Sequence, residues 1–181
     1  MKKIIVFASG SGSNFQALAE ACQNSKKESI VLLVASKKGI GAIEKAKNFN
    51  IPVFIEASGD LTEELKKFKP DLICLAGYLK KIPPSILALC PIMNIHPALL
   101  PKYGGKGMHG IYVHEAVLKS GDKISGATVH FIDEEYDKGK IILQKSAPVL
   151  AGDTPQTLAK RVLEVEHQIY PAAVKEFFEN N

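Results

Sequence analysis

Residues 2–22 read KKIIVFASGSGSNFQALAEAC, and this stretch decides the fold class. Its apolar run, Ile4–Ala8, is continuous, which is typical of a strand buried on both faces of a parallel sheet. A loop of glycines and serines follows, and residues 14–22 then place Phe15 and Leu18 on one face of a helix. The stretch therefore predicts a strand, a tight turn and a helix, the first unit of an α/β fold.

The same alternation continues along the chain. We expect further strands at 30–35, 52–55, 71–76 and 92–95, and helices at 40–50, 61–68 and 84–89. Beyond a glycine-rich loop, we expect a helix at 111–119, two strands at 127–132 and 141–144, and a long helix at 154–178. The prediction is a single α/β domain covering residues 1–181. It has a Rossmann-like, mostly parallel twisted sheet with helices on both faces, C-terminal antiparallel strands and a long C-terminal helix.

Composition excludes several classes of protein. A chain of 181 residues with 46% hydrophobic and 23% charged residues suits one globular domain and not a disordered chain. The apolar part of the first strand is too short for a signal peptide or a membrane span, so we expect a soluble protein of the cytoplasm. The net charge of +4 comes almost entirely from lysine, and Arg161 is the only arginine, which argues against binding to nucleic acid.

The cysteines and histidines do not form a recognisable metal site. Three cysteines without C-x-x-C spacing make a disulfide framework or a structural zinc site improbable, and Cys74 is expected in the core. His109 and His114 are five residues apart, whereas two ligands on one helical face are four apart. We therefore predict no metal.

The segment 94–101, NIHPALLP, carries the strongest chemical signal. Asn94 and His96 are two residues apart at the end of a predicted strand, so their side chains point to the same side. A carboxamide can donate a hydrogen bond and an imidazole can move a proton near neutral pH, so the pair suits stabilisation of an oxyanion. The alternative is a capping asparagine beside a satisfied histidine.

The loop after the first strand suggests a phosphate site. Glycines allow close approach of a ligand to the backbone, and free N–H groups at the start of a helix favour an anion. The third glycine of a dinucleotide fingerprint is replaced by Phe15, so a single phosphate monoester fits better than NAD. A tight turn with a polar cap explains the same residues without a ligand.

Three further segments offer candidates. Asp137 lies in the acidic turn 133–139, where a carboxylate beside His96 would raise the pKa of that imidazole; a plain hairpin connection is the alternative. Lys106 in the loop 102–110 is a candidate anion partner, or simply a solvated lysine. The segment 75–82 follows a predicted strand, where open α/β sheets bind ligands, and could take a flat heterocycle.

Taken together, the chain resembles the phosphoribosylglycinamide formyltransferases over nearly its whole length. The resemblance is carried by the order and spacing of the motifs 10–14 (GSGSN), 75–78 (LAGY), 94–101 (NIHPALLP), 136–139 (YDKG) and 166–171 (EHQIYP). It implies transfer of the formyl group of 10-formyltetrahydrofolate, the co-substrate, to the amine of 5-phosphoribosylglycinamide in purine synthesis.

The resemblance also implies roles for individual residues. Asn94, His96 and Asp137 would be catalytic. The substrate phosphate would be held by Gly12, Ser13 and Asn14, with Glu166 and Lys106 as further ribonucleotide contacts, and the folate would be bordered by Leu79, Lys80, Lys81 and Ile82. Only small-molecule partners are expected, with no nucleic acid or membrane, and the protein would be a monomer or homodimer.

Three rival functions remain. Methionyl-tRNA formyltransferase shares the Asn-x-His pattern but has a further C-terminal domain. Formyltetrahydrofolate hydrolase shares the core but normally has an additional N-terminal domain, so the limits of this chain favour the ribonucleotide enzyme. A non-catalytic phosphate- or nucleotide-binding module would explain the first loop but would give Asn94, His96 and Asp137 no role.

Overall fold

The computed structural model describes residues 1–56, 60–133 and 137–180. The chain divides into two compact units, Met1–Met93 and Asn94–Asn181, and each is described by itself. The prediction of a single domain therefore stays a prediction. Of the predicted acidic turn, residues 134–136 lie outside the described residues, as do residues 57–59 and 181.

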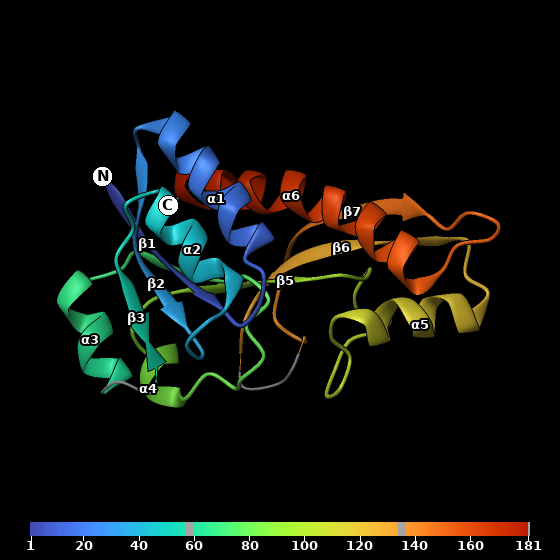
Figure 1. Ribbon diagram of the computed structural model, residues 1–181, viewed down its shortest axis with the longest axis horizontal. Helices are drawn as coiled ribbons and strands as arrows, with labels where there is room; N and C mark the ends of the chain where they lie inside the picture. The colour runs from blue at the N-terminus through green and yellow to red at the C-terminus, as the bar shows by residue number, and fades with distance from the viewer. Residues whose placement is uncertain (57–59, 134–136, 181) are drawn as a thin grey trace. The chain divides into compact units, whose positions relative to one another are not determined.

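The first unit is built on a parallel sheet (Figure 1). Its strands are β1 (Lys2–Ala8), β2 (Glu28–Ala35), β3 (Val53–Ile55) and β4 (Leu72–Leu75), hydrogen-bonded in the order β3-β2-β1-β4. All three pairings are parallel. From Ile4 to Ala8 the side chains of β1 have no exposed surface, which is why this strand reads as a continuous apolar run.

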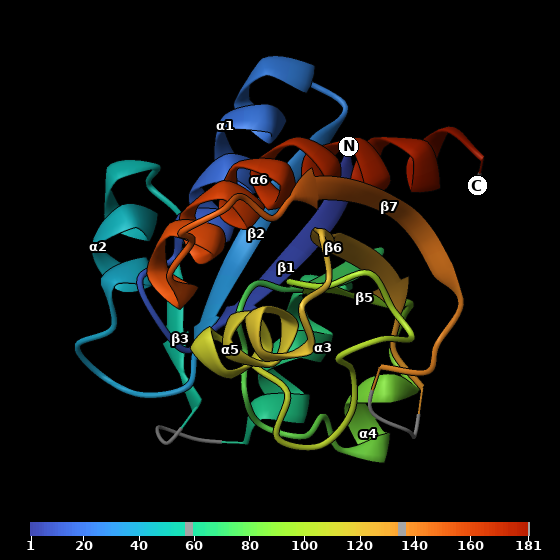
Figure 2. The ribbon, with the colours of Figure 1, turned by 90° about the vertical axis from the view of Figure 1, so that its right-hand side faces the viewer.

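Helices connect the strands of this unit. They are α1 (Ser13–Ser25), α2 (Gly41–Asn48), α3 (Leu61–Phe68) and the short α4 (Pro84–Leu87). The chain moves outward from β1 to β3 and then returns to β4, so right-handed crossovers place α1 and α2 on one face and α3 on the other (Figure 2). This reversal between β1 and β4 is the position at which open α/β sheets bind ligands.

The second unit carries the antiparallel strands. β5 (Ile92–His96) begins in the first unit and ends in the second, where the order is β5-β6-β7. β6 (Ile124–Phe131) and β7 (Ile141–Pro148) are antiparallel. The long helix α6 (Pro155–Glu179) packs against both of these strands and against α5 (Ile111–Ser120) (Figure 2).

The predicted helix at 154–178 is confirmed as α6. Thr154 is its N-cap and forms a reciprocal capping box with Thr157, and Pro155 occupies the first turn. One apolar stripe of the helix is buried, including Leu158 and Val162. These local signals therefore fixed both the start of the helix and the face that it turns to the sheet.

The prediction for β6 was wrong at its N-terminal end. We expected the strand to start at residue 127, but it starts at Ile124 and pairs with β7 as far as Pro148. Gly126 has low strand propensity, yet it lies in β6, where the backbone of Lys145 passes so close that no side chain fits at this position. The glycine is there because two strands approach closely, which the sequence alone does not reveal.

The structure also bears on the predictions about membrane spans and cysteines. Within the three described ranges, no helix is both long enough and apolar enough to cross a membrane. Cys22 and Cys90 are free thiols, and Cys74 is buried in β4, as predicted for a small core residue.

Candidate active site

The end of β5 brings Asn94 and His96 into one polar cluster of the second unit. The Asn94 side chain lies 3.2 Å from His130 Nε2 (Nδ2 to Nε2), and His96 Nδ1 lies 3.8 Å from Asp137 Oδ2. His130 Nε2 is 3.5 Å from Asp137 Oδ1, so the two pairs meet at one carboxylate. The structure thus brings together the three residues that the resemblance marked as catalytic.

The ring of His96 is held in one orientation. Its Nε2 is 2.8 Å from the backbone carbonyl oxygen of Tyr103, and a carbonyl can only accept, so Nε2 carries a proton. Nδ1 is then the nitrogen that gains or loses a proton, and it faces Asp137. The 3.8 Å separation is longer than a direct hydrogen bond, so this pair is an electrostatic contact.

Asp137 is held as an anion by its surroundings. Its Oδ2 accepts a hydrogen bond of 2.8 Å from the Gly105 backbone N–H. Burial acts to raise the pKa of this carboxyl group, but the contacts with His130, the Gly105 N–H and His96 outweigh burial and hold the pKa below its ordinary value of 3.8. The acid therefore remains charged throughout the neutral range.

Burial determines the charge of His96. The side chain is only 4% exposed, and desolvation lowers its pKa below 6.5. Asp137 and the Tyr103 carbonyl act to raise the pKa, and His130 acts to lower it further. The prediction that a neighbouring carboxylate would raise the His96 pKa was right for the contribution of Asp137. It was wrong for the net shift, because the desolvation of the imidazolium lowers the pKa by more than Asp137 raises it.

His130 is a member of the cluster that the sequence did not single out. It is 1% exposed on β6, its Nδ1 is 2.9 Å from the Phe131 carbonyl oxygen, and its Nε2 is in contact with Asn94. Nδ1–H donates to that carbonyl, and Nε2 lies between the Asn94 amide and Asp137 Oδ1. Its alternation with Thr128 along β6 indicates the face on which it lies, but the position of Asn94 on the neighbouring β5 is needed to show its role.

His114 lies within electrostatic range of His96. It is 4% exposed on α5, and desolvation, together with the charge of His96, lowers its pKa to about 4. Its Nδ1 is buried without a hydrogen-bond partner in the described part of the chain. The same ranges hold no group of three or more His, Cys, Asp or Glu side chains that could bind a metal ion.

A dense hydrogen-bond network fixes the segment that follows His96. The Thr128 hydroxyl donates to the Ala98 carbonyl oxygen at 2.6 Å and accepts from the Leu100 N–H at 3.1 Å. Gln144 donates to both Thr128 Oγ1 and the Leu100 carbonyl oxygen. Strands β6 and β7 therefore hold the path of the backbone as it leaves β5.

The candidate phosphate loop belongs to the first unit. Gly12 is the N-cap of α1 with φ of 75°, and a Cβ at this position would lie 2.6 Å from the Ala42 Cα. Only glycine suits both the backbone angle and the close approach of α2. Ser13 and Asn14 begin α1, and the backbone N–H groups at the start of a helix favour an anion.

The candidate folate segment also lies in the first unit. Leu79 is 61% exposed, and its N–H donates to Ser9 Oγ at 3.2 Å. Lys80 Nζ is 2.9 Å from Glu56 Oε2, while Lys81 is exposed and Ile82 is buried. The segment thus offers an exposed apolar side chain and a lysine already paired with a carboxylate.

The two remaining candidates have contrasting surroundings. Lys106 is exposed in the loop before α5, whereas Glu166 is 8% exposed on α6.

Comparison with known proteins adds evidence independent of this geometry. The model of the formyl transferase family matches residues 2–174. A chloroplastic phosphoribosylglycinamide formyltransferase from Arabidopsis thaliana is 48% identical over 96% of this chain and 64% of its own length, and one from Vigna unguiculata is 46% identical over 96% and 60%. The chain thus spans less than two thirds of the length of these curated relatives.

Solved structures of similar length share the fold. Glycinamide ribonucleotide transformylase 1 from Symbiobacterium toebii has a TM-score of 0.91 and 34% identity, covering 99% of this chain and 89% of that protein. Phosphoribosylglycinamide formyltransferase from Brucella melitensis has a TM-score of 0.84 and 37% identity, covering 97% and 95%. These matches confirm the predicted fold, with its mostly parallel sheet and long C-terminal helix.

Proposed function

Because the chain belongs to the formyl transferase family, we propose that it transfers the formyl group of 10-formyltetrahydrofolate to the amine of 5-phosphoribosylglycinamide. The observation that carries this proposal is the cluster of Asn94, His96, His130 and Asp137, in which an amide, two imidazoles and a carboxylate meet. These are the groups that acyl transfer from nitrogen to nitrogen needs, with no covalent enzyme intermediate.

The reaction passes through a tetrahedral intermediate. The substrate amine nitrogen forms a bond to the formyl carbon, and the carbonyl π electrons move to oxygen. The attacking nitrogen then loses a proton, and the folate nitrogen gains one as its bond to the formyl carbon breaks. Asn94 and His96 would donate hydrogen bonds to the oxyanion, where a single donor is typically worth about 10²–10³ in rate.

The lowered pKa of His96 determines when it is charged. In the empty site the imidazole is predominantly neutral at neutral pH, since burial opposes its charge. A developing oxyanion beside Nδ1 raises the pKa, so this nitrogen takes up a proton as the intermediate forms. Asp137 would stabilise the imidazolium and help to pass the proton to the leaving nitrogen.

The substrate contacts that we propose include residues of both units. Gly12, Ser13 and Asn14 would hold the phosphate at the start of α1, and Leu79, Lys80, Lys81 and Ile82 would border the folate. Glu166 and Lys106 would contact the ribonucleotide. This assignment is supported by the positive φ of Gly12, which opens the start of the helix to an anion, and by the exposed apolar side chain of Leu79.

We further infer that the protein acts on small molecules alone, without metal or nucleic acid, as a monomer or homodimer. A cytoplasmic location stays a prediction, because the plant relatives carry chloroplastic in their names.

The proposal is tested by incubating the purified protein with 10-formyltetrahydrofolate, with and without 5-phosphoribosylglycinamide, and measuring formation of tetrahydrofolate. We expect turnover only when the ribonucleotide is present. His96→Ala and Asn94→Ala should each lower the rate about 10²–10³-fold. His109→Ala is the matched control, since His109 is an exposed imidazole that contacts Tyr112.

Each of the other outcomes identifies a different function. Equal turnover without the ribonucleotide indicates a hydrolase, and absence of turnover with saturable phosphate binding indicates a binding module. Near-normal transfer by folded His96→Ala would remove His96 from the mechanism.

A further inference from the structure

The backbone carbonyl that orients His96 belongs to a residue with an unusual conformation. Tyr103 has φ of 56°, in the left-handed region that few residues other than glycine occupy. In this conformation its carbonyl oxygen lies 2.8 Å from His96 Nε2. A strained backbone of this kind persists only where the surroundings hold it in place.

The side chain of Tyr103 supplies that hold. Its hydroxyl donates to Asp122 Oδ2 at 2.8 Å and lies 2.5 Å from Ser120 Oγ. Lys102 Nζ is 3.1 Å from the same Asp122 oxygen. The hydrogen bonds from Tyr103 and Lys102 lower the pKa of Asp122, so the acceptor is an anion at neutral pH.

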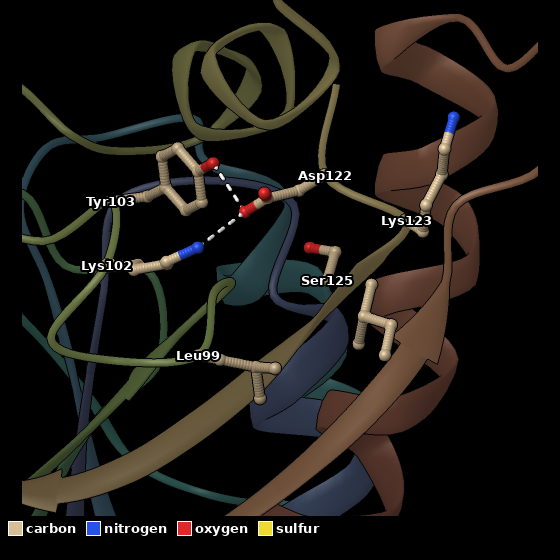
Figure 3. A pocket seen from close by; sticks show the side chains of 7 residues that line it. Leu99, Lys102, Tyr103, Asp122, Lys123 and Ser125 are labelled. Carbon is tan, nitrogen blue, oxygen red and sulfur yellow. Dashed lines mark hydrogen bonds and ion pairs between the residues drawn. The ribbon is translucent and has the colours of Figure 1, made fainter. Parts of the chain in front are cut away.

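The anchored tyrosine lines a pocket of the second unit. Tyr103 and Asp122 line a pocket of about 420 Å³ together with Leu99 and Lys123 (Figure 3). The dashed lines in the figure show that Tyr103 and Lys102 both reach Asp122. These hydrogen bonds hold the hydroxyl end of the ring at the pocket wall.

We propose that Tyr103 and Asp122 are positioning residues for His96: the Asp122 carboxylate anchors the Tyr103 hydroxyl, which keeps the Tyr103 carbonyl on His96 Nε2 and leaves Nδ1 for the chemistry. This inference rests on the proposed function, because it assigns these residues to the reaction of His96. Neither residue touches the substrate in this scheme.

Loss of the anchor should change both the geometry and the charge of His96. The groups that face this imidazole are Asp137, His130, His114 and the Tyr103 carbonyl. Of these, Asp137 and the carbonyl favour the imidazolium. When the carbonyl becomes mobile, the ring loses one of its two stabilising contacts, so its pKa falls further and Nδ1 is no longer held toward the reacting atoms.

The test uses two variants that remove the anchor from opposite ends, Tyr103→Phe and Asp122→Ala. We expect kcat to fall about 10-fold in each, with KM for both substrates within about twofold of wild type. Asp122→Asn should recover most of the rate, because its amide oxygen still accepts from the tyrosine hydroxyl. Lys123→Ala, which alters the same pocket wall, is the matched control and should behave as wild type.

A measurement without catalysis separates this inference from the proposed function. NMR titration of the imidazoles, with His96 assigned from His96→Asn, should show a lower His96 pKa in Tyr103→Phe and Asp122→Ala than in wild type. An unchanged His96 pKa and an unchanged kcat in both folded variants would overturn the inference. If no formyl transfer occurs in wild type but the pKa moves, the proposed function fails while the positioning contact stands.

Discussion

Replacing His114 with leucine should make the stability of the protein much less dependent on pH between about 6.5 and 4. In the folded chain this imidazole is buried on α5 and its pKa is lowered to about 4, whereas in the unfolded chain it returns to the ordinary value near 6.5. Between these values the unfolded state binds the proton and the folded state does not. Stability is therefore fully retained above pH 6.5 and is lost as the pH falls toward 4.

The magnitude follows from the two pKa values. A difference from 6.5 to about 4 corresponds to about 3 kcal/mol of unfolding free energy, at about 1.4 kcal/mol for each pKa unit. His96 contributes with the same sign, because burial lowers its pKa as well. The lowered pKa values of Asp137 and Asp122 act below 3.8, outside this range. His114 should thus account for much of the loss.

The assay is urea unfolding of wild type and His114→Leu at pH 7.5 and pH 4.5, followed by circular dichroism. We expect the wild type to lose more stability than the variant between these two pH values, by about 2–3 kcal/mol. Equal losses in the two proteins would refute the reasoning, because the imidazole would then titrate as if it were exposed. His109→Leu, at an exposed position, is the control and should follow wild type.

Three other substitutions test separate contacts. Asp137→Asn removes the charge facing His96 and should lower the kcat of formyl transfer about 10²-fold, measured at pH 7.5 with stability checked by thermal unfolding. Gly12→Ala should destabilise the protein by more than about 1 kcal/mol in urea unfolding, because its φ is positive and Ala42 lies where the new Cβ would be. Thr128→Val leaves the buried partners of the hydroxyl unpaired and should cost about 1–3 kcal/mol in the same assay.

Each of these three substitutions has its own control or its own result that would contradict the prediction. Full transfer activity in Asp137→Asn would end the electrostatic account of the carboxylate. Gly10→Ala, where a Cβ meets nothing within 4 Å, should change stability by less than about 0.5 kcal/mol, and an equal effect at both glycines would contradict the steric argument. Thr128→Ser keeps the hydroxyl, so a loss as large as that of Thr128→Val would show that the missing methyl group, and not the hydrogen bonds, is responsible.

Much of the fold could be predicted from the sequence because its signals are local. The apolar run Ile4–Ala8 and the capping residue Thr154 act through their immediate neighbours, so strand and helix type follow from the pattern. The start of β6 could not be predicted, because the close approach of the Gly126 and Lys145 backbones depends on how β6 and β7 pair. Strand propensity is a property of a single residue, whereas strand pairing depends on two segments that are distant in the sequence.

The candidate site divides in the same way. Asn94 and His96 could be predicted to share a side because they alternate on one strand, but their contacts with His130 and Tyr103 depend on distant segments. The charge of His96 was the least predictable property. The charge depends on how completely the His96 ring is buried, and the presence of an acidic residue in the sequence does not indicate the extent of that burial.

The hydrogen bond from the Gly105 N–H to Asp137 gives the protein a built-in spectroscopic reporter. An amide proton that donates to a carboxylate is deshielded, so the Gly105 resonance should respond when that acid changes its partner. Isotope labelling of glycine alone would make this signal visible in a crowded spectrum. Ligand titrations could then be followed at the carboxylate itself, even with substrate analogues that never turn over.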